Sequence, residues 1–181
     1  MATRPKSPEV VSFVGRSGSG KTTLLERVIP ELVRRGVRIG AIKHDAHRFE
    51  IDHPGKDSYR LAAAGAAVTL VSSPEKLALV RRHDTAPAVE EILETYFADV
   101  DLVLVEGFKR SALPKVEVHR RGRGAELICR GAERDETLIA VASDEPLDLD
   151  VPVLDLDSPV AVAEFLLSRL PPRAATAAKA P

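Results

Sequence analysis

The sequence predicts an α/β fold with a mostly parallel central sheet, helices on both faces of that sheet and an additional β-hairpin. Four short apolar runs without polar alternation indicate buried strands, at 10–15, 37–43, 101–107 and 137–143. Stretches with helical spacing of apolar residues lie between these runs. Apolar strands that alternate with helices are typical of a parallel sheet covered on both faces.

The first predicted helix follows a glycine-rich turn and ends near Gly36, where the apolar spacing stops. Pro30 lies inside this helix and is expected to bend it. A shorter helix is predicted at 57–66, with Asp57 or Ser58 as its N-cap, because short polar side chains satisfy the first backbone N–H groups of a helix.

The middle of the chain holds two candidate hairpins. Strands at 67–73 and 76–82 lie close enough in sequence to pair, and a helix at 87–97 follows them. The runs at 115–121 and 125–131 alternate apolar and polar residues and are predicted to pair across the glycines between them. Exposed apolar residues on this second hairpin are one candidate for a surface between two copies of the chain.

The last predicted helix spans 157–170, with Ser158 as N-cap and Pro159 at the first helical position. The polar, alanine-rich tail after it has no apolar period. The expected organisation is a disordered start, one domain and a disordered tail: 1–9, 10–170 and 171–181.

Composition narrows the class of protein. The 181 residues are 44% apolar and 29% charged, with a net charge of −1, which favours no nucleic acid and no membrane surface as a partner. No apolar run approaches the roughly 18 residues that span a bilayer. The single cysteine, Cys129, cannot form an internal disulfide, which favours a reducing cytoplasm.

The segment GRSGSGKT, residues 15–22, matches the phosphate-binding pattern G-x-x-x-x-G-K-[ST] and lies between a predicted strand and a predicted helix. Its glycines let backbone N–H groups point at one anion, and the helix N-terminus favours negative charge. We expect Lys21 to reach the β- and γ-phosphates, Thr22 to ligate Mg²⁺ and Thr23 to hold an α-phosphate oxygen. The expected nucleotide-binding residues of this segment are Gly15, Ser17, Gly18, Ser19, Gly20, Lys21, Thr22 and Thr23.

A second acidic group is expected at the end of the strand in DLVLVEGFK. Asp101 and Glu106 lie roughly 16 Å apart along an extended strand, and ligands bind beyond the carboxyl ends of parallel strands. Glu106 is therefore predicted to hold Mg²⁺ or its waters, and Asp101 to lie on the opposite rim. Gly107 allows the backbone to turn near the γ-phosphate, and Lys109 either contacts an anion or is solvated.

The segment KHDAHRFEIDHPGKDSYR, residues 43–60, also starts at the ligand side, because Lys43 and His44 end the second strand. The favoured interpretation is a switch-like nucleotide or substrate loop. In it Asp52 or Asp57 binds Mg²⁺ through water, and Lys43 and Lys56 meet phosphate.

Two other interpretations of this segment remain open. His44 and His47, with His53 or Asp52, have the ligand chemistry of a transition-metal site, although regular spacing and cysteine are missing. A solvated connection is the second.

The chain has no N-K-x-D segment of the kind that reads guanine in ordinary GTPases. The run AVASD, residues 140–144, ends a predicted central strand. Asp144 can accept hydrogen bonds from the ring N–H and the amino group of guanine, and Ser143 is a second candidate. A simple turn at the end of the strand fits these residues equally well.

Four segments together resemble the molybdopterin-guanine dinucleotide biosynthesis protein B (MobB) family, in family order: SFVGRSGSGKTTLLERVIPEL, IGAIKHDAHRFEIDHPGKDSYRLAAAGAA, DLVLVEGFK and IAVASDEPLDLDVPVLDLDS. The resemblance extends from about Val10 to Leu170. It implies a SIMIBI-class P-loop GTPase, usually a homodimer, that binds GTP and Mg²⁺ and hydrolyses GTP weakly.

The resemblance further implies an adapter for MobA, the guanylyltransferase that forms molybdopterin guanine dinucleotide, with molybdopterin as a further candidate ligand. By residue, it implies phosphate binding by Gly18, Gly20, Lys21, Thr22 and Thr23 and a magnesium role for Glu106. The implied residues of the histidine-containing loop are His44, His47, Asp52, Lys56 and Asp57. Asp52 and Glu106 are the candidates for a catalytic role.

Two alternative functions are also compatible with the phosphate loop at 15–22. A small-molecule kinase needs an arginine-rich lid, for which only the segment 120–134 qualifies, and that segment fits a charged hairpin better. A metallochaperone GTPase for zinc or nickel needs the histidine-containing loop to hold metal.

Overall fold

The computed structural model of the chain describes residues 7–44, 49–124, 126–131 and 134–171. These residues group into two compact units, where the sequence suggests one domain over 10–170. The first unit lies within Met1–His44 and Tyr96–Pro181 and contains the central sheet. The second lies within Asp45–Thr95 and contains a separate two-stranded sheet.

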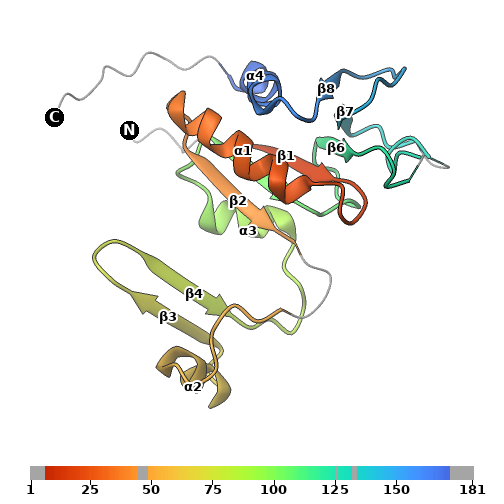
Figure 1. Cartoon of the computed structure of the whole chain (residues 1–181). Helices are drawn as coiled ribbons and strands as arrows, with labels where there is room; N and C mark the ends of the chain where they lie inside the picture. The colour runs from red at the N-terminus through yellow and green to blue at the C-terminus, as the bar shows by residue number, and fades with distance from the viewer. Residues whose placement is uncertain (1–6, 45–48, 125, 132–133, 172–181) are drawn as a thin grey trace, which may run out of the picture. The chain divides into compact units, whose positions relative to one another are not determined.

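The first unit is built on a six-stranded sheet with the strand order β2-β5-β1-β6-β7-β8 (Figure 1). Its neighbouring strands pair in parallel, which confirms the predicted α/β fold with a mostly parallel central sheet. The elements of this unit are β1 (Glu9–Val14), α1 (Lys21–Arg34), β2 (Ile39–Lys43), β5 (Leu102–Glu106), β6 (Lys115–His119), β7 (Leu138–Ser143), β8 (Val153–Asp155) and α4 (Pro159–Arg169).

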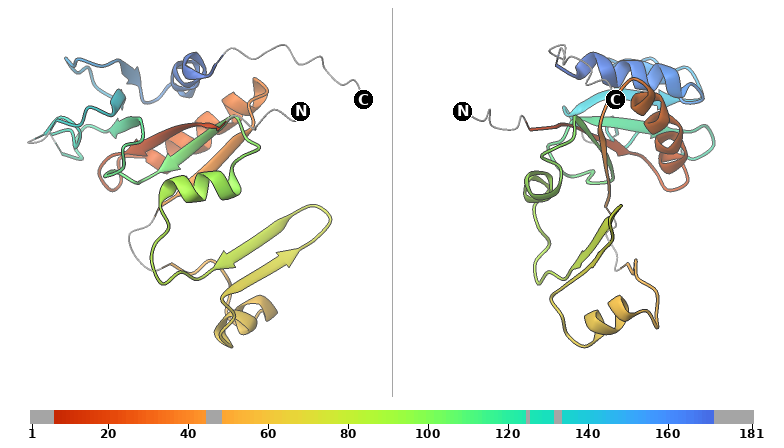
Figure 2. Two further views of the ribbon diagram at one scale, coloured as in Figure 1. Left: turned by 180° about the vertical axis from the view of Figure 1, so that it is seen from behind. Right: turned by 90° about the vertical axis from the view of Figure 1, so that its left-hand side faces the viewer.

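Helices α1 and α4 pack against each other and against one face of the sheet (Figure 2). Leu24, Val28 and Leu32 of α1 are almost inaccessible to solvent, as are Val162 and Leu166 of α4. Burial of each such side chain contributes about 1.5–3 kcal/mol. The apolar spacing that predicts α1 therefore marks the side of this helix that packs into the core.

The predicted cap of α4 is confirmed. Ser158 Oγ accepts a hydrogen bond from the backbone N–H of Ala161 at 3.3 Å, and Pro159 occupies the first helical position. Among the described residues, none of the helices has both the length and the apolar run that crossing a bilayer requires.

The predicted hairpin of 115–121 with 125–131 is wrong. Strand β6 lies inside the central sheet, between β1 and β7, and pairs in parallel with both. Its alternation does not mark a solvated face, because Lys115, Glu117 and His119 are 1%, 2% and 7% exposed. Val116 and Val118 face the helices and are also buried, so they offer no surface to a second copy of the chain.

The polar face of β6 is buried because each of its side chains has internal partners. Lys115 Nζ donates hydrogen bonds to the backbone oxygen of Ser111 at 2.6 Å and to Thr137 Oγ1 at 2.5 Å, and lies 3.2 Å from a carboxylate oxygen of Asp135. A buried charge is tolerated when it is paired and hydrogen-bonded in this way. Sequence periodicity alone does not distinguish such a face from a solvated one.

The second unit contains α2 (Asp57–Ala63), β3 (Val68–Ser72), β4 (Leu77–Arg81) and most of α3 (Val89–Tyr96). Strands β3 and β4 pair antiparallel, which confirms the predicted hairpin of 67–73 with 76–82. The predicted cap of α2 is wrong, because the N-cap is Lys56 and no side chain accepts a cap hydrogen bond there. Leu70, Val71 and Leu77 of the hairpin are 51%, 53% and 62% exposed.

Candidate functional site

Three parallel strands end at the same level on one rim of the central sheet. Phe13 of β1 and Lys43 of β2 both stand in register with Glu106 of β5. Since the carboxyl ends of parallel strands face the ligand crevice of such sheets, Lys43, Glu106 and the residues just after Phe13 share one rim. The glycine-rich loop at 15–20 follows β1 and leads into α1 (Figure 1).

Gly15 begins this loop in a conformation that only glycine adopts easily, with φ of +145°. A β-carbon at this position would lie 2.4 Å from the backbone oxygen of Val118 on β6. The loop therefore runs tightly over β6 before it turns into α1. Ser19 is buried at the base of the loop, and its N–H donates to the backbone oxygen of Arg16 at 3.2 Å.

The side chain of Lys21 lies folded over the loop. Its Nζ donates hydrogen bonds to the backbone oxygens of Gly15 at 3.1 Å and Arg16 at 2.9 Å. Partial burial lowers the pKa of Lys21, the charge of Glu106 opposes this, and the positive charge of Lys43 adds to it. A phosphate bound in the loop would give the ammonium group of Lys21 an anionic partner.

Glu106 connects two elements at the rim. Thr22 Oγ1 donates a hydrogen bond to Glu106 Oε2 at 2.7 Å, and Lys43 Nζ donates to Oε1 at 2.9 Å. Partial burial raises the pKa of Glu106, but the hydrogen bonds from Thr22 and Lys43 outweigh this effect, so its pKa lies below the ordinary 4.5. The convergence of Lys43, Glu106 and the loop on one rim is confirmed.

The oxygen atoms of Thr22 and Glu106 suit Mg²⁺. This cation prefers hard oxygen ligands, retains several waters and is commonly bound by one or two carboxylates together with substrate phosphates. A hydroxyl and an ionised carboxylate 2.7 Å apart, at the mouth of a phosphate loop, provide such a donor set. The residues present therefore fit a magnesium ion, which Thr22 and Glu106 would hold.

Gly107 and Phe108 shape the turn that follows β5. A β-carbon at Gly107 would lie 3.0 Å from the β-carbon of His44, so the two turns approach closely. The ring of His44 stacks on Phe108 with ring centroids 3.9 Å apart. His44 thus lies against the turn that follows β5, where its ring stacks on Phe108, a residue that the sequence does not single out, and its contact with a bound nucleotide stays a prediction.

Other predicted residues belong to the second unit or lie outside the described residues. His47 lies outside them. Asp52 accepts a hydrogen bond from the backbone N–H of His53 at 2.8 Å, and Asp57 pairs with Arg60 at 3.3 Å. Among the described residues, no group of three or more potential metal-binding side chains gathers. The roles of Asp52, Lys56 and Asp57 in ligand binding, and the histidine metal site, stay predictions.

Asp144 follows β7 and already has partners within the chain. Its Oδ1 accepts a hydrogen bond from the backbone N–H of Arg121 at 2.7 Å, and its Oδ2 lies 3.5 Å from the guanidinium of Arg120. Ser143 Oγ donates to the backbone oxygen of Glu145 at 2.7 Å. Asp144 thus links the end of β7 to the segment after β6, and its contact with a base stays a prediction.

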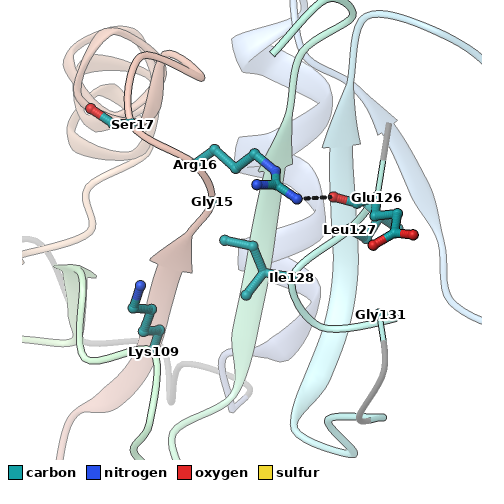
Figure 3. Close-up of a pocket in the computed structure, with 8 residues that line it drawn as sticks. All are labelled: Gly15, Arg16, Ser17, Lys109, Glu126, Leu127, Ile128 and Gly131. Carbon is teal, nitrogen blue, oxygen red and sulfur yellow. Dashed lines mark hydrogen bonds between the residues drawn. The ribbon is translucent and has the colours of Figure 1, made fainter. Parts of the chain in front are cut away.

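A cavity of about 510 Å³ lies beside the start of the loop (Figure 3). The side chains of Lys109 and Ile128 point into it, and Arg16 closes one edge by donating to the backbone oxygen of Glu126 at 3.4 Å. The residues that line it are Gly15, Arg16, Ser17, Lys109, Glu126, Leu127, Ile128 and Gly131. Lys109 is thereby placed next to the loop, although the sequence leaves it undecided.

The buried carboxylate of Glu117 holds one wall of this cavity. It accepts hydrogen bonds from the backbone N–H groups of Ile128 at 2.6 Å and Cys129 at 2.9 Å. Burial and the nearby charge of Glu117 raise the pKa of the Cys129 thiol to about 12. Cys129 is therefore a protonated core residue.

Comparison with known proteins agrees with this geometry. Residues 10–144 match the family model described as molybdopterin guanine dinucleotide synthesis protein B, MobB. The chain belongs to the MobB family. The matched range contains the phosphate loop, both strands that carry Lys43 and Glu106, and β6 and β7.

Curated MobB relatives match over most of their length. The chain is 43% identical over 168 residues to the molybdopterin-guanine dinucleotide biosynthesis adapter protein of Escherichia coli K12, covering 87% of this chain and 91% of that protein. It is 37% identical to the adapter protein of Haemophilus influenzae, covering 87% and 86%. A crystal structure of molybdopterin-guanine biosynthesis protein B matches with a TM-score of 0.72 and 33% identity, covering 89% of this chain and 99% of that one.

Proposed function

We propose that this MobB-family chain is a GTP- and Mg²⁺-binding adapter in molybdenum cofactor biosynthesis, which assists a MobA-type guanylyltransferase in forming molybdopterin guanine dinucleotide. The observation that carries the proposal is the convergence of Lys21, Thr22 and Glu106 on one rim. The relatives that match most of the chain are named adapter proteins of the same biosynthesis.

The residues of this site have distinct roles in nucleotide binding. The backbone N–H groups of the loop and of the first turn of α1 donate hydrogen bonds to the phosphate oxygens. Lys21 leaves the carbonyl oxygens of Gly15 and Arg16 and pairs with the phosphates, which satisfies its charge. Thr22 and Glu106 would hold the Mg²⁺ ion, and Lys43 keeps Glu106 ionised and oriented. When bound there, Mg²⁺ would neutralise charge on the phosphate oxygens.

An adapter needs nucleotide binding more than fast turnover, so we assign at most weak GTP hydrolysis to the chain. Glu106 is the proposed residue for that activity, and a role of Asp52 stays a prediction from the sequence. A cytoplasmic setting fits a chain with one buried thiol, because reduced cysteines persist there.

A homodimer belongs to the same proposal. The β3–β4 hairpin exposes Leu70, Val71 and Leu77, and two strands alone are marginally stable in water. A second copy of the chain is the proposed cover of this apolar surface. Leu77→Asp should lower the mass measured by light scattering, whereas Val33→Asp, a change at an exposed apolar position on α1, should not. Equal masses for both variants would argue against this surface.

Two titrations and a pull-down test the proposed function. Lys21→Ala should reduce GTP affinity by about 1.5–3 kcal/mol, because it removes a charged phosphate contact. The wild-type chain should capture the MobA-type transferase, and capture should change with GTP and Mg²⁺. Unchanged GTP affinity in the Lys21 variant, or no capture under any condition, would contradict the proposal.

Two further assays separate the alternative functions. Transfer of the γ-phosphate from GTP to a small acceptor would indicate a kinase. Stoichiometric zinc or nickel in the purified wild-type chain, lost in a His44→Ala/His47→Ala variant, would indicate a metallochaperone.

A further inference from the structure

Arginines of the segment 120–124, which follows β6, lie against glycines of the phosphate loop. The guanidinium carbon of Arg123 lies 3.5 Å from the position that a β-carbon would take on Gly18. The guanidinium of Arg120 lies 3.6 Å from the equivalent position on Gly20. In this part of the molecule the two segments are therefore in contact through positively charged groups.

In a third contact the arginine belongs to the phosphate loop and the glycine belongs to the 120–124 segment. Arg16 of the phosphate loop passes beneath Gly124, where a β-carbon would lie 2.6 Å from its Nε. The 120–124 segment is also closed on itself, since the N–H of Arg123 donates to the backbone oxygen of Arg120 at 3.0 Å. Its start is anchored by the hydrogen bond from the N–H of Arg121 to Asp144. These two hydrogen bonds thus fix the backbone that places Arg120 and Arg123 over the loop.

The strand order explains what these arginines add. Strand β1 lies between β5 and β6, so Glu106 and Lys43 flank its loop on one side and the 120–124 segment flanks it on the other. Lys21 lies between the two sides. A phosphate group held in the loop would therefore meet Lys43 on one side, Lys21 at the loop itself and two guanidinium groups on the other side.

The charges on this second side are incompletely balanced. Arg120 reaches Asp144 at 3.5 Å, which is longer than the 2.7–2.9 Å of a charge-assisted hydrogen bond, and the other oxygen of Asp144 is already used by a backbone N–H. These guanidinium groups stand at the N-terminus of α1, which already favours anions. An anion with several negative charges is the ligand class that such an arrangement binds.

We infer that Arg120 and Arg123 are nucleotide-binding residues that hold the phosphates of the bound nucleoside triphosphate from the β6 side of the loop. The inference rests on the proposed GTP binding and adds two residues that select for phosphate. Both side chains present several N–H donors in a planar fork, which suits phosphate oxygens. The segment predicted as a charged hairpin or a kinase lid is thus the second wall of the nucleotide site.

Titration of GTP in Mg²⁺ buffer tests this assignment. Arg123→Ala and Arg120→Ala should each weaken GTP binding by about tenfold or more, the effect expected for loss of a charged hydrogen bond. The affinity for guanosine, measured by competition, should change less than twofold, because guanosine has no phosphate. Arg123→Lys should recover part of the lost GTP affinity, since it restores the charge without the fork.

Arg121→Ala is the matched control. It removes the same charge from the same segment, but the Arg121 side chain is 82% exposed and its guanidinium lies 3.8 Å from Glu145. The backbone N–H that binds Asp144 is retained in this variant. GTP affinity should stay within twofold of wild type. Thermal melting should show that all the variants remain folded.

Two results would overturn the inference. One is wild-type GTP affinity in both the Arg120 and the Arg123 variants. The other is an equal loss in the Arg121 variant, which would indicate a general effect of net charge. Lys21→Ala measured in parallel separates this inference from the proposed function: if Lys21 matters and the two arginines do not, only the arginine assignment fails.

Discussion

Thr22 and Glu106, separated by 84 positions in the sequence, are joined by a hydrogen bond of 2.7 Å between Oγ1 and Oε2. The bond connects the first turn of α1 to the end of β5. It places one hydroxyl and one ionised carboxylate where a phosphate-bound cation would lie. The site therefore depends on the parallel pairing of β1 with β5, which brings these residues to one rim.

Glu106→Gln should weaken the dependence of GTP binding on magnesium. Glutamine keeps the shape of the side chain and removes the charge that holds the cation. We expect the gain in GTP affinity on adding Mg²⁺ to fall by about tenfold or more. Isothermal titration with and without Mg²⁺ measures it. Asp101→Asn is the control on the opposite rim, where the carboxylate accepts from the backbone N–H of Arg38, and its magnesium response should equal that of the wild type.

The contribution of Glu106 to stability should depend on pH. The folded-state pKa lies below the ordinary 4.5, so the unfolded chain binds a proton at higher pH than the folded one. The contribution is therefore complete above about pH 4.5 and is lost as the pH falls through the folded-state pKa. Urea unfolding of wild type and Glu106→Gln should give a stability difference that shrinks on going from pH 6 to pH 3. A difference that grows on acidification would contradict this sign.

Gly15→Ala should destabilise the chain far more than Gly122→Ala. Both glycines have positive φ, which strains an alanine: the cost is about 1–2 kcal/mol near the left-handed region of Gly122, and the φ of +145° at Gly15 is one that only glycine adopts easily. At Gly122 no atom lies within 4 Å of an added β-carbon, whereas at Gly15 the backbone oxygen of Val118 would lie 2.4 Å away. We expect the clash to add about 2 kcal/mol or more to the loss of unfolding free energy. Denaturant unfolding of both variants measures this difference.

Sequence reasoning predicts the rim of this site because strand ends are visible in a sequence. Glu106 and Lys43 each close an apolar run, and parallel strands bring such ends together. The glycine pattern likewise fixes the phosphate loop without any knowledge of tertiary contacts. These inferences depend on short-range periodicity and on one general rule of α/β sheets.

The second wall of the site could not be predicted in the same way. The alternation in β6 is the same whether Glu117 faces water or accepts two buried N–H groups, so periodicity alone predicts a solvated hairpin. The contacts of Arg120 and Arg123 with glycines of the loop depend on where β6 lies in the sheet. That position follows from packing between residues distant in sequence.

The buried pair of Glu117 and the 128–129 backbone gives a further prediction. Glu117→Gln replaces one carboxylate oxygen by an NH₂ group, which cannot accept from the second N–H. An unsatisfied buried N–H costs about 1–3 kcal/mol, so the 126–131 segment should open more often. Cys129 reports this opening, because the residue is 3% exposed and the pKa of its thiol is raised to about 12.

Alkylation by iodoacetamide at pH 8 measures the effect. In the wild-type chain Cys129 should react slowly when folded and fully in guanidinium chloride, because reaction needs an exposed thiolate. The Glu117→Gln variant should react several-fold faster while it is still folded. Glu126→Gln, a change in the same segment that leaves the Glu117 hydrogen bonds in place, should react like the wild type. Equal rates in all three folded proteins would mean that Glu117 does not hold this wall of the cavity closed.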